Sequence, residues 1–98
     1  MRLRDKDVEN QLKIYMDRED YFAYNQFLIK LLKIYFVNKV KENVPNFKYT
    51  TLIDLIDSKG KLGRRDRRLL ERFYVEQHEE DEKLLAENLY DIYKKTIN

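Results

Sequence analysis

Only two glycines and one proline interrupt this chain of 98 residues. Glycine and proline supply many of the backbone conformations that tight turns require, so their scarcity favours a few long helices over many short strands. No stretch alternates apolar and polar residues over the length of a half-buried strand. The sequence therefore predicts an all-α protein, and its length predicts a single domain over residues 1–98.

Apolar residues recur at helical spacing in five segments. The expected helices are residues 5–17, residues 20–43, a brief third from Thr50 or Thr51 to Gly60, a fourth from about Arg64 to near His78, and a last one after Asp81. Asp17 or Asp20 is expected to cap the second helix, Asp81 the last, and Asn43 with Pro45 to end the second. The resulting fold is an up-and-down helical bundle of four main helices plus one short helix.

The helix over residues 20–43 carries the broadest apolar surface, which is typical of a central helix. One stripe of residues is expected to face the core: Tyr21, Tyr24, Leu28, Leu31 and Tyr35. Three further apolar residues widen this stripe: Phe27, Ile34 and Val37. The inward residues expected on the last two helices are Leu69, Leu70, Phe73, Tyr74, Leu85, Leu89, Ile92 and Tyr93.

Several classes of site are excluded by composition. The chain has no cysteine, so it can form neither a disulfide nor a thiolate metal site, and this absence fits a reducing cytoplasm. The longest apolar-rich stretch, residues 27–37, is broken by two lysines and is shorter than the ~20 residues of a membrane span. No Gly-rich phosphate loop is present, and the single histidine, His78, stands before acidic residues typical of a helix cap. We therefore expect a cytoplasmic protein with no membrane contact, no metal and no cofactor.

The net charge of +2 conceals a local asymmetry. Seven basic residues against two acidic ones lie between positions 59 and 72, and seven acidic residues against Lys83 alone lie between positions 76 and 91. A basic block followed by an acidic block indicates a polarised surface, self-association, or both.

Five arginines concentrate in the stretch GRRDRRLLER. In a helix that begins near Arg64, every fourth residue shares one face, so Arg64, Arg68 and Arg72 form a ridge. The guanidinium group pairs with phosphate in a bidentate manner, and this chemistry predicts nucleic-acid binding by Arg64, Arg65, Arg67 and Arg68. The same residues also fit an exposed face that the acidic segment 76–91 neutralises, from the same chain or from a partner.

Arg72 and His78 are candidates for catalysis. In an unbroken helix they would diverge by about 120° and ~9 Å, so they meet only if the helix ends before His78 or two chains face each other. Brought together, the imidazole could move a proton at an RNA 2′-hydroxyl, and the arginine could stabilise charge on the phosphate in the transition state. The alternative is a histidine at a helix C-terminus, where a cation is favoured in any case.

Residues 51–97 resemble the C-terminal half of HEPN domains: a short helix, a Gly-containing loop, a helix ending in an Arg-x(4–6)-His motif, and a last amphipathic helix. Arg72 and His78 occupy the motif positions. The resemblance implies a helical bundle that forms a homodimer and places two motifs in one cleft that cuts or binds RNA. Many members of that family are ribonucleases of toxin–antitoxin or defence systems, and others bind RNA without cutting it.

Two functions follow as expectations. The first is a HEPN-like protein that binds RNA or acts as a metal-independent endoribonuclease. The alternative is a non-enzymatic helical adaptor or inhibitor that binds a protein or a nucleic acid through the Arg-rich face. The residues leave open whether the chain is an enzyme.

Overall fold

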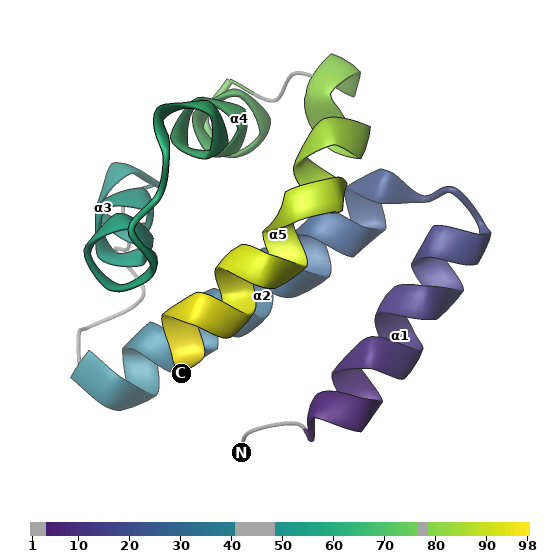
Figure 1. Ribbon diagram of the computed structural model, residues 1–98, viewed down its shortest axis with the longest axis horizontal. Helices are drawn as coiled ribbons and strands as arrows, with labels where there is room; N and C mark the ends of the chain where they lie inside the picture. The colour runs from purple at the N-terminus through teal and green to yellow at the C-terminus, as the bar shows by residue number, and fades with distance from the viewer. Residues whose placement is uncertain (1–3, 41–48, 77–78) are drawn as a thin grey trace.

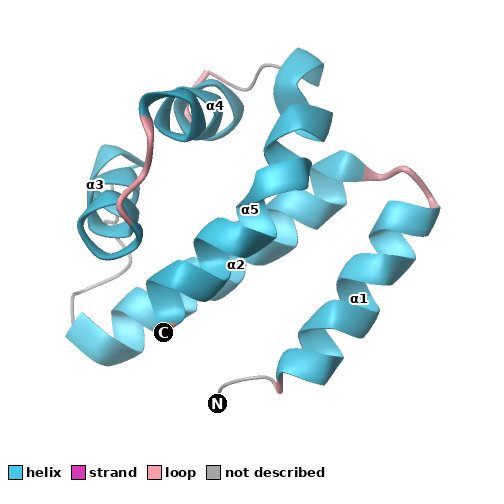
Figure 2. Ribbon diagram, viewed as in Figure 1, coloured by secondary structure: helices cyan, strands magenta, loops and turns pink. Residues whose placement is uncertain are grey.

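The computed structural model describes residues 4–40, 49–76 and 79–98, and within them it is all-helical, with no strand. The elements in chain order are α1 (Asp5–Asp17), α2 (Tyr21–Val40), α3 (Tyr49–Gly60), α4 (Arg64–Tyr74), the 3-10 turn η2 (Glu79–Asp81) and α5 (Glu82–Ile97) (Figure 2). The predicted helical class is confirmed. The predicted ends of the second helix at Asn43 and Pro45 lie outside the described residues.

Helices α2 and α5 lie against each other along most of their length and form the centre of the molecule (Figure 1). Helix α1 packs on α2, whereas α3 and α4 pack on each other and on α5. In Figure 1 α3 and α4 are seen nearly along their axes, while α1, α2 and α5 lie across the view. The helices are 11 to 20 residues long, and no single one is clearly shorter than the rest. The arrangement of four main helices plus one short helix, running up and down, therefore stays a prediction.

The core centres on α2, but on a face rotated from the predicted stripe. Tyr24 and Leu28 are buried as expected, and Leu32 and Phe36, which the stripe did not include, are fully buried as well. Ile34, expected inside, is 40% exposed. At ~100° per residue these positions place the buried face roughly 70° from the predicted one. The error arises because apolar residues surround most of this helix and mark no single side.

The inward faces of α4 and α5 are those expected. All eight residues are buried: Leu69, Leu70, Phe73, Tyr74, Leu85, Leu89, Ile92 and Tyr93. Both helices alternate apolar and charged sides clearly, so the helical period alone identified the core face.

Helix α1 is the most peripheral element and buries only Val8 and Leu12. The Tyr90 hydroxyl of α5 donates a hydrogen bond to the Glu9 carboxylate at 2.9 Å, which ties α1 to the central pair. Burial and this hydrogen bond raise the pKa of Tyr90, so the hydroxyl remains a donor well above neutral pH.

The helix termini follow the predictions in part. The Ala23 backbone N–H donates to Asp20 Oδ1 at 3.1 Å, which confirms Asp20 as the cap of α2. Helix α4 ends at Tyr74, four residues before the predicted end. Asp81 stands at the N-cap of α5 as expected, but its carboxylate makes no capping hydrogen bond. The prediction that Asp81 caps α5 through its side chain is therefore wrong.

The apolar-rich stretch 27–37 lies wholly within α2, where it supplies the core. Among the described residues, none of the helices combines the length and the apolar character that a bilayer crossing requires.

Gly60 ends α3, as the sequence predicts, but it is not the left-handed residue of the turn that follows. The left-handed residue of the turn is Lys61, at φ 50°, whose N–H bonds to the Asp57 carbonyl at 2.9 Å. A Cβ at Gly60 would lie 2.9 Å from Thr96 Oγ1, which is fully buried and donates to the Ile92 carbonyl. The glycine is therefore needed for the close approach of α3 to α5.

We expect Gly60→Ala to destabilise the protein by about 1–3 kcal/mol, because the added methyl group overpacks a buried contact. Helix propensity alone would predict the opposite sign, since alanine is favoured over glycine by about 1 kcal/mol. Denaturant unfolding of Gly60→Ala, Thr96→Ala and the double variant separates the two effects. A cost of Gly60→Ala that is unchanged in the Thr96→Ala background would contradict the steric explanation.

Candidate functional site

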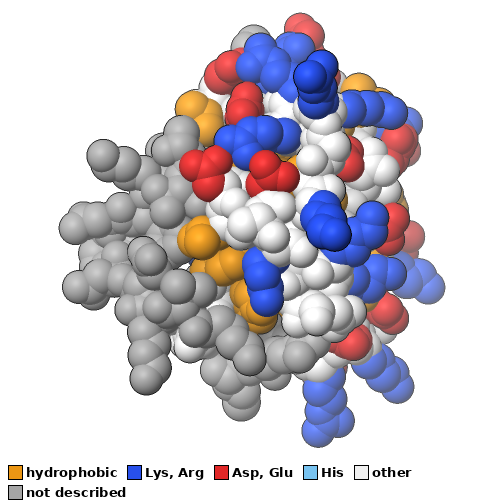
Figure 3. All heavy atoms as spheres, turned by 60° about the vertical axis from the view of Figure 1, so that its left-hand side comes forward, with side chains coloured by type: hydrophobic (Ala, Val, Ile, Leu, Met, Phe, Trp, Pro, Cys, Tyr) orange, Lys and Arg blue, Asp and Glu red, His pale blue; other side chains and the backbone are white. Residues whose placement is uncertain are grey.

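Helix α4 carries all five arginines of the predicted site. Its apolar side packs into the core, so the arginines lie on the outward sides. Figure 3 shows the side of the molecule where α3 and α4 lie, and the Lys and Arg side chains there are interspersed with Asp and Glu. The charge pairing of each arginine therefore decides which of them can bind an external phosphate.

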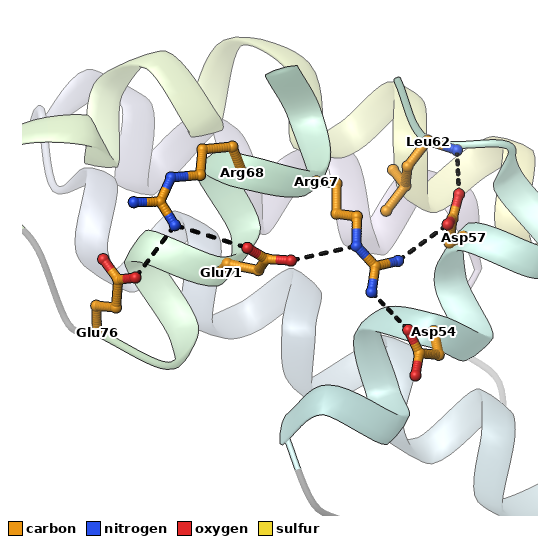
Figure 4. A network of polar contacts seen from close by, with 7 residues as sticks. All are labelled: Asp54, Asp57, Leu62, Arg67, Arg68, Glu71 and Glu76. Atoms are coloured by element: carbon orange, nitrogen blue, oxygen red, sulfur yellow. Dashed lines mark hydrogen bonds and ion pairs between the residues drawn. The ribbon is translucent and has the colours of Figure 1, made fainter. Parts of the chain in front are cut away.

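Arg67 is surrounded by three carboxylates. Its three guanidinium nitrogens contact Asp54 at 2.6 Å, Asp57 at 2.9 Å and Glu71 at 3.2 Å (Figure 4). The hydrogen bond to Asp54 is the largest cause of the raised pKa of Arg67. Two of these carboxylates belong to α3, so Arg67 joins α3 to α4, and a phosphate could reach its guanidinium only by displacing them.

Asp57 has a second role in the same joint. Its Oδ1 accepts a hydrogen bond from the Leu62 backbone N–H at 3.0 Å, while Oδ2 contacts Arg67 (Figure 4). The short α3–α4 connection and the start of α4 are thus fixed by one carboxylate.

Arg68 is more exposed, at 58%, and extends the same network. It contacts Glu76 at 3.2 Å and Glu71 at 3.7 Å (Figure 4). An exposed ion pair of this kind contributes little to stability and exchanges readily with other anions. Arg68 can therefore take part in external contacts at small cost.

Arg72 forms an ion pair with Asp81, with 2.8 Å between Nε and Oδ2. Both atoms are shielded from solvent, and the contact lacks the alignment of a hydrogen bond. The pair joins the end of α4 to η2. His78 lies outside the described residues, so the structure places Arg72 but the proximity of Arg72 and His78 stays a prediction.

Arg64 and Arg65 differ from the other three arginines. Both are exposed, and neither forms an ion pair with a described residue. They occupy the first two positions of α4, where Gly63 provides no capping side chain. With the exposed Lys59 and Lys61, they form an unneutralised basic group at the α3–α4 turn.

The alternative of a neutralised arginine face thus holds for part of the ridge. The acidic segment 76–91 supplies Glu76 to Arg68 and Asp81 to Arg72, whereas Arg67 is neutralised mainly by α3. Sequence reasoning missed Asp54 and Asp57. The sequence did contain a signal for this contact. The two aspartates are three residues apart, so they share one face of their helix, and only a short loop separates that helix from the arginines.

No group of three or more His, Cys, Asp or Glu side chains in the described part of the chain is arranged to hold a metal ion. The three carboxylates of Asp54, Asp57 and Glu71 are each engaged by the guanidinium of Arg67.

Comparison with known proteins identifies no relative: no family model, no curated protein and no solved structure matches the chain. The likeness to HEPN domains therefore rests on the residues of the second half alone.

We expect Arg67→Gln to lower the melting temperature more than Arg65→Gln, because only Arg67 joins α3 to α4 and its loss leaves three carboxylates close together. The difference should shrink in high salt, since these groups are partly exposed and their interactions are screened. Thermal unfolding of both variants at low and high ionic strength measures it. Equal melting temperatures in low salt would contradict a structural role for Arg67.

Proposed function

We propose that this chain is a helical RNA-binding protein, HEPN-like in its second half, that contacts the phosphate backbone through Arg64, Arg65 and Arg68. The observation that carries the proposal is that Arg64 and Arg65 are exposed and form no ion pair with any described residue. In the proposal the helices keep the four-plus-one bundle arrangement, and two copies associate as a homodimer in the cytoplasm.

Chemistry supports phosphate as the ligand at these arginines. A guanidinium offers paired N–H donors that match two phosphate oxygens, and nucleic-acid affinity depends largely on such contacts. The backbone N–H groups at the start of α4 add partial positive charge beside the two arginines. Arg67, which the sequence also placed in this role, contributes indirectly by fixing α4 on α3.

The Arg64→Gln/Arg65→Gln variant should bind single-stranded RNA more weakly and with a smaller dependence on salt. For two lost phosphate contacts, the slope of log affinity against log salt should fall by about 1.4 in magnitude. Fluorescence anisotropy with a labelled RNA over a series of salt concentrations measures both quantities.

The matched control is Lys6→Gln/Lys13→Gln, which removes the same charge from exposed positions of α1. Equal weakening by the two double variants would show that net charge, and not the α4 arginines, governs the binding. Absence of salt-dependent RNA affinity in the unmodified chain would contradict the proposed function itself.

RNA cleavage is the more specific form of this proposal. His78 would accept the proton of the 2′-hydroxyl or protonate the leaving oxygen, and Arg72 would stabilise the charge on the phosphate. The ion pair with Asp81 orients Arg72 but also occupies it. A substrate phosphate must therefore compete with the Asp81 carboxylate for the guanidinium.

We expect His78→Ala to reduce cleavage of single-stranded RNA by a factor of about 10² to 10⁴, the usual contribution of a general acid or base. The variant should keep the helical circular dichroism spectrum and the RNA affinity of the unmodified chain. Cleavage that survives the substitution unchanged would exclude His78 from catalysis. Binding without any cleavage would leave an RNA-binding protein that is not an enzyme.

The second candidate is a non-enzymatic adaptor or inhibitor. It is favoured by the use of Arg67, Arg68 and Arg72 in ion pairs within the chain, which reduces the basic surface open to RNA. In that case His78→Ala has no effect, and Arg68→Glu weakens binding to a protein or nucleic-acid partner.

A further inference from the structure

A groove lies between α2 and the corner formed by α4, η2 and α5. Its volume is about 360 Å³, and its lining residues are Phe22, Gln26, Lys33, Phe73, Tyr74, Glu79 and Glu82. None of the arginines discussed above lines it. The groove lies at the C-terminal end of α4, roughly 15 Å along the helix from Arg64 and Arg65.

The floor of the groove is aromatic and partly open to solvent. Phe22 is 52% exposed, the largest exposed fraction among the large apolar side chains of the described residues. Its ring lies 5.8 Å from the ring of the buried Phe73, in a tilted arrangement. A half-exposed aromatic ring packed on a buried one is a favourable anchor for a partner's apolar side chain.

One edge of the groove is acidic, because Glu79 and Glu82 lie there. Burial, together with the nearby charges of Glu79 and Asp20, raises the pKa of Glu82. In the described part of the chain, no basic side chain pairs with Glu79 or Glu82. The free energy of these carboxylates would be lowered by a cation placed among them.

Lys33 is the one cation among the described residues that line the groove, and it contacts an aromatic ring. The Lys33 ammonium group lies over the ring of Tyr74, 4.8 Å from its centre. The groove therefore combines an apolar floor with an excess of negative charge along one edge.

We propose that this groove binds a cationic amphipathic helix of a partner protein. An apolar side chain of that helix packs on Phe22 and Phe73, and an arginine or lysine one turn away faces Glu79 and Glu82. This inference goes beyond the proposed RNA binding, because it uses the opposite end of α4 and none of its arginines.

The charge of the groove favours a cationic helix over a nucleic acid as its occupant. The acidic edge repels the phosphates of a nucleic acid, which favour the opposite end of α4. A helix laid in a groove presents anchors at successive turns, so an apolar anchor and a cation lie on the same face and match the floor and the edge together.

The test is selection from a displayed library of helical peptides with randomised surface positions, using the full chain as the target. Enriched peptides should carry a large apolar residue with arginine or lysine one turn away. Their dissociation constants should rise at least tenfold with Phe22→Ser and with Glu79→Gln/Glu82→Gln. The control is Ile34→Ser, which removes another exposed apolar side chain of α2 outside the groove and should leave the affinity unchanged.

Circular dichroism melts of each variant separate loss of binding from loss of fold. Because the glutamine variant preserves both side-chain shapes, its effect on binding remains interpretable if Phe22→Ser unfolds. Enrichment of acidic peptides, or of peptides that bind all variants equally, would overturn the proposal. Sedimentation showing that the chain associates with itself through Phe22 would assign the groove to a second copy and would also overturn it. RNA binding by Arg64 and Arg65 is unaffected by either result.

Discussion

The burial of α2 against α5 is the constraint on which the other features depend. Leu28 and Leu32 on α2 and Leu85 and Leu89 on α5 are all fully buried. Each such side chain contributes about 1.5–3 kcal/mol by leaving water. Because α2 is apolar on most of its circumference, it needs cover on more than one side, which α5 and α1 provide. Phe22, near the start of α2, stays half-exposed in the groove beside α4 and η2.

Helices α3 and α4 are attached to this centre by packing on α5 and to each other by polar contacts at their solvent-facing edge. Arg67 is the principal contact of that edge, since it bridges Asp54 and Asp57 of α3 and Glu71 of α4. The arginines of α4 thus fall into two groups, according to whether they form an ion pair within the chain. Three serve ion pairs within the chain, and the two at the helix start have no such partner among the described residues.

The predictable parts of the molecule are those where one physical signal dominates. Helices α4 and α5 alternate apolar and charged sides, so the sequence identified their buried residues correctly. The buried face of α2 was misplaced because its apolar residues mark no single side. The role of Asp81 was misjudged because a carboxylate at a helix start can serve either the backbone N–H groups or a nearby cation. Only the spatial position of Arg72 decides between them.

The basic and acidic blocks of the sequence neutralise each other only in part. The charges that remain without a partner among the described residues lie near opposite ends of α4. Glu76 pairs with Arg68 and Asp81 with Arg72, which leaves cations at the start of the helix and carboxylates beyond its end. The cations at the start of α4 oppose its helix dipole, which disfavours positive charge at the N-terminus by about 0.3–1 kcal/mol each, whereas Glu82 lies in the first turn of α5, whose dipole favours a carboxylate. A bound phosphate would convert that unfavourable term into a favourable one, and a cation of a bound helix would lower the free energy of Glu79 and Glu82 at the other end. Each end of α4 is therefore stabilised most by a partner of opposite charge, and the two partners differ in kind.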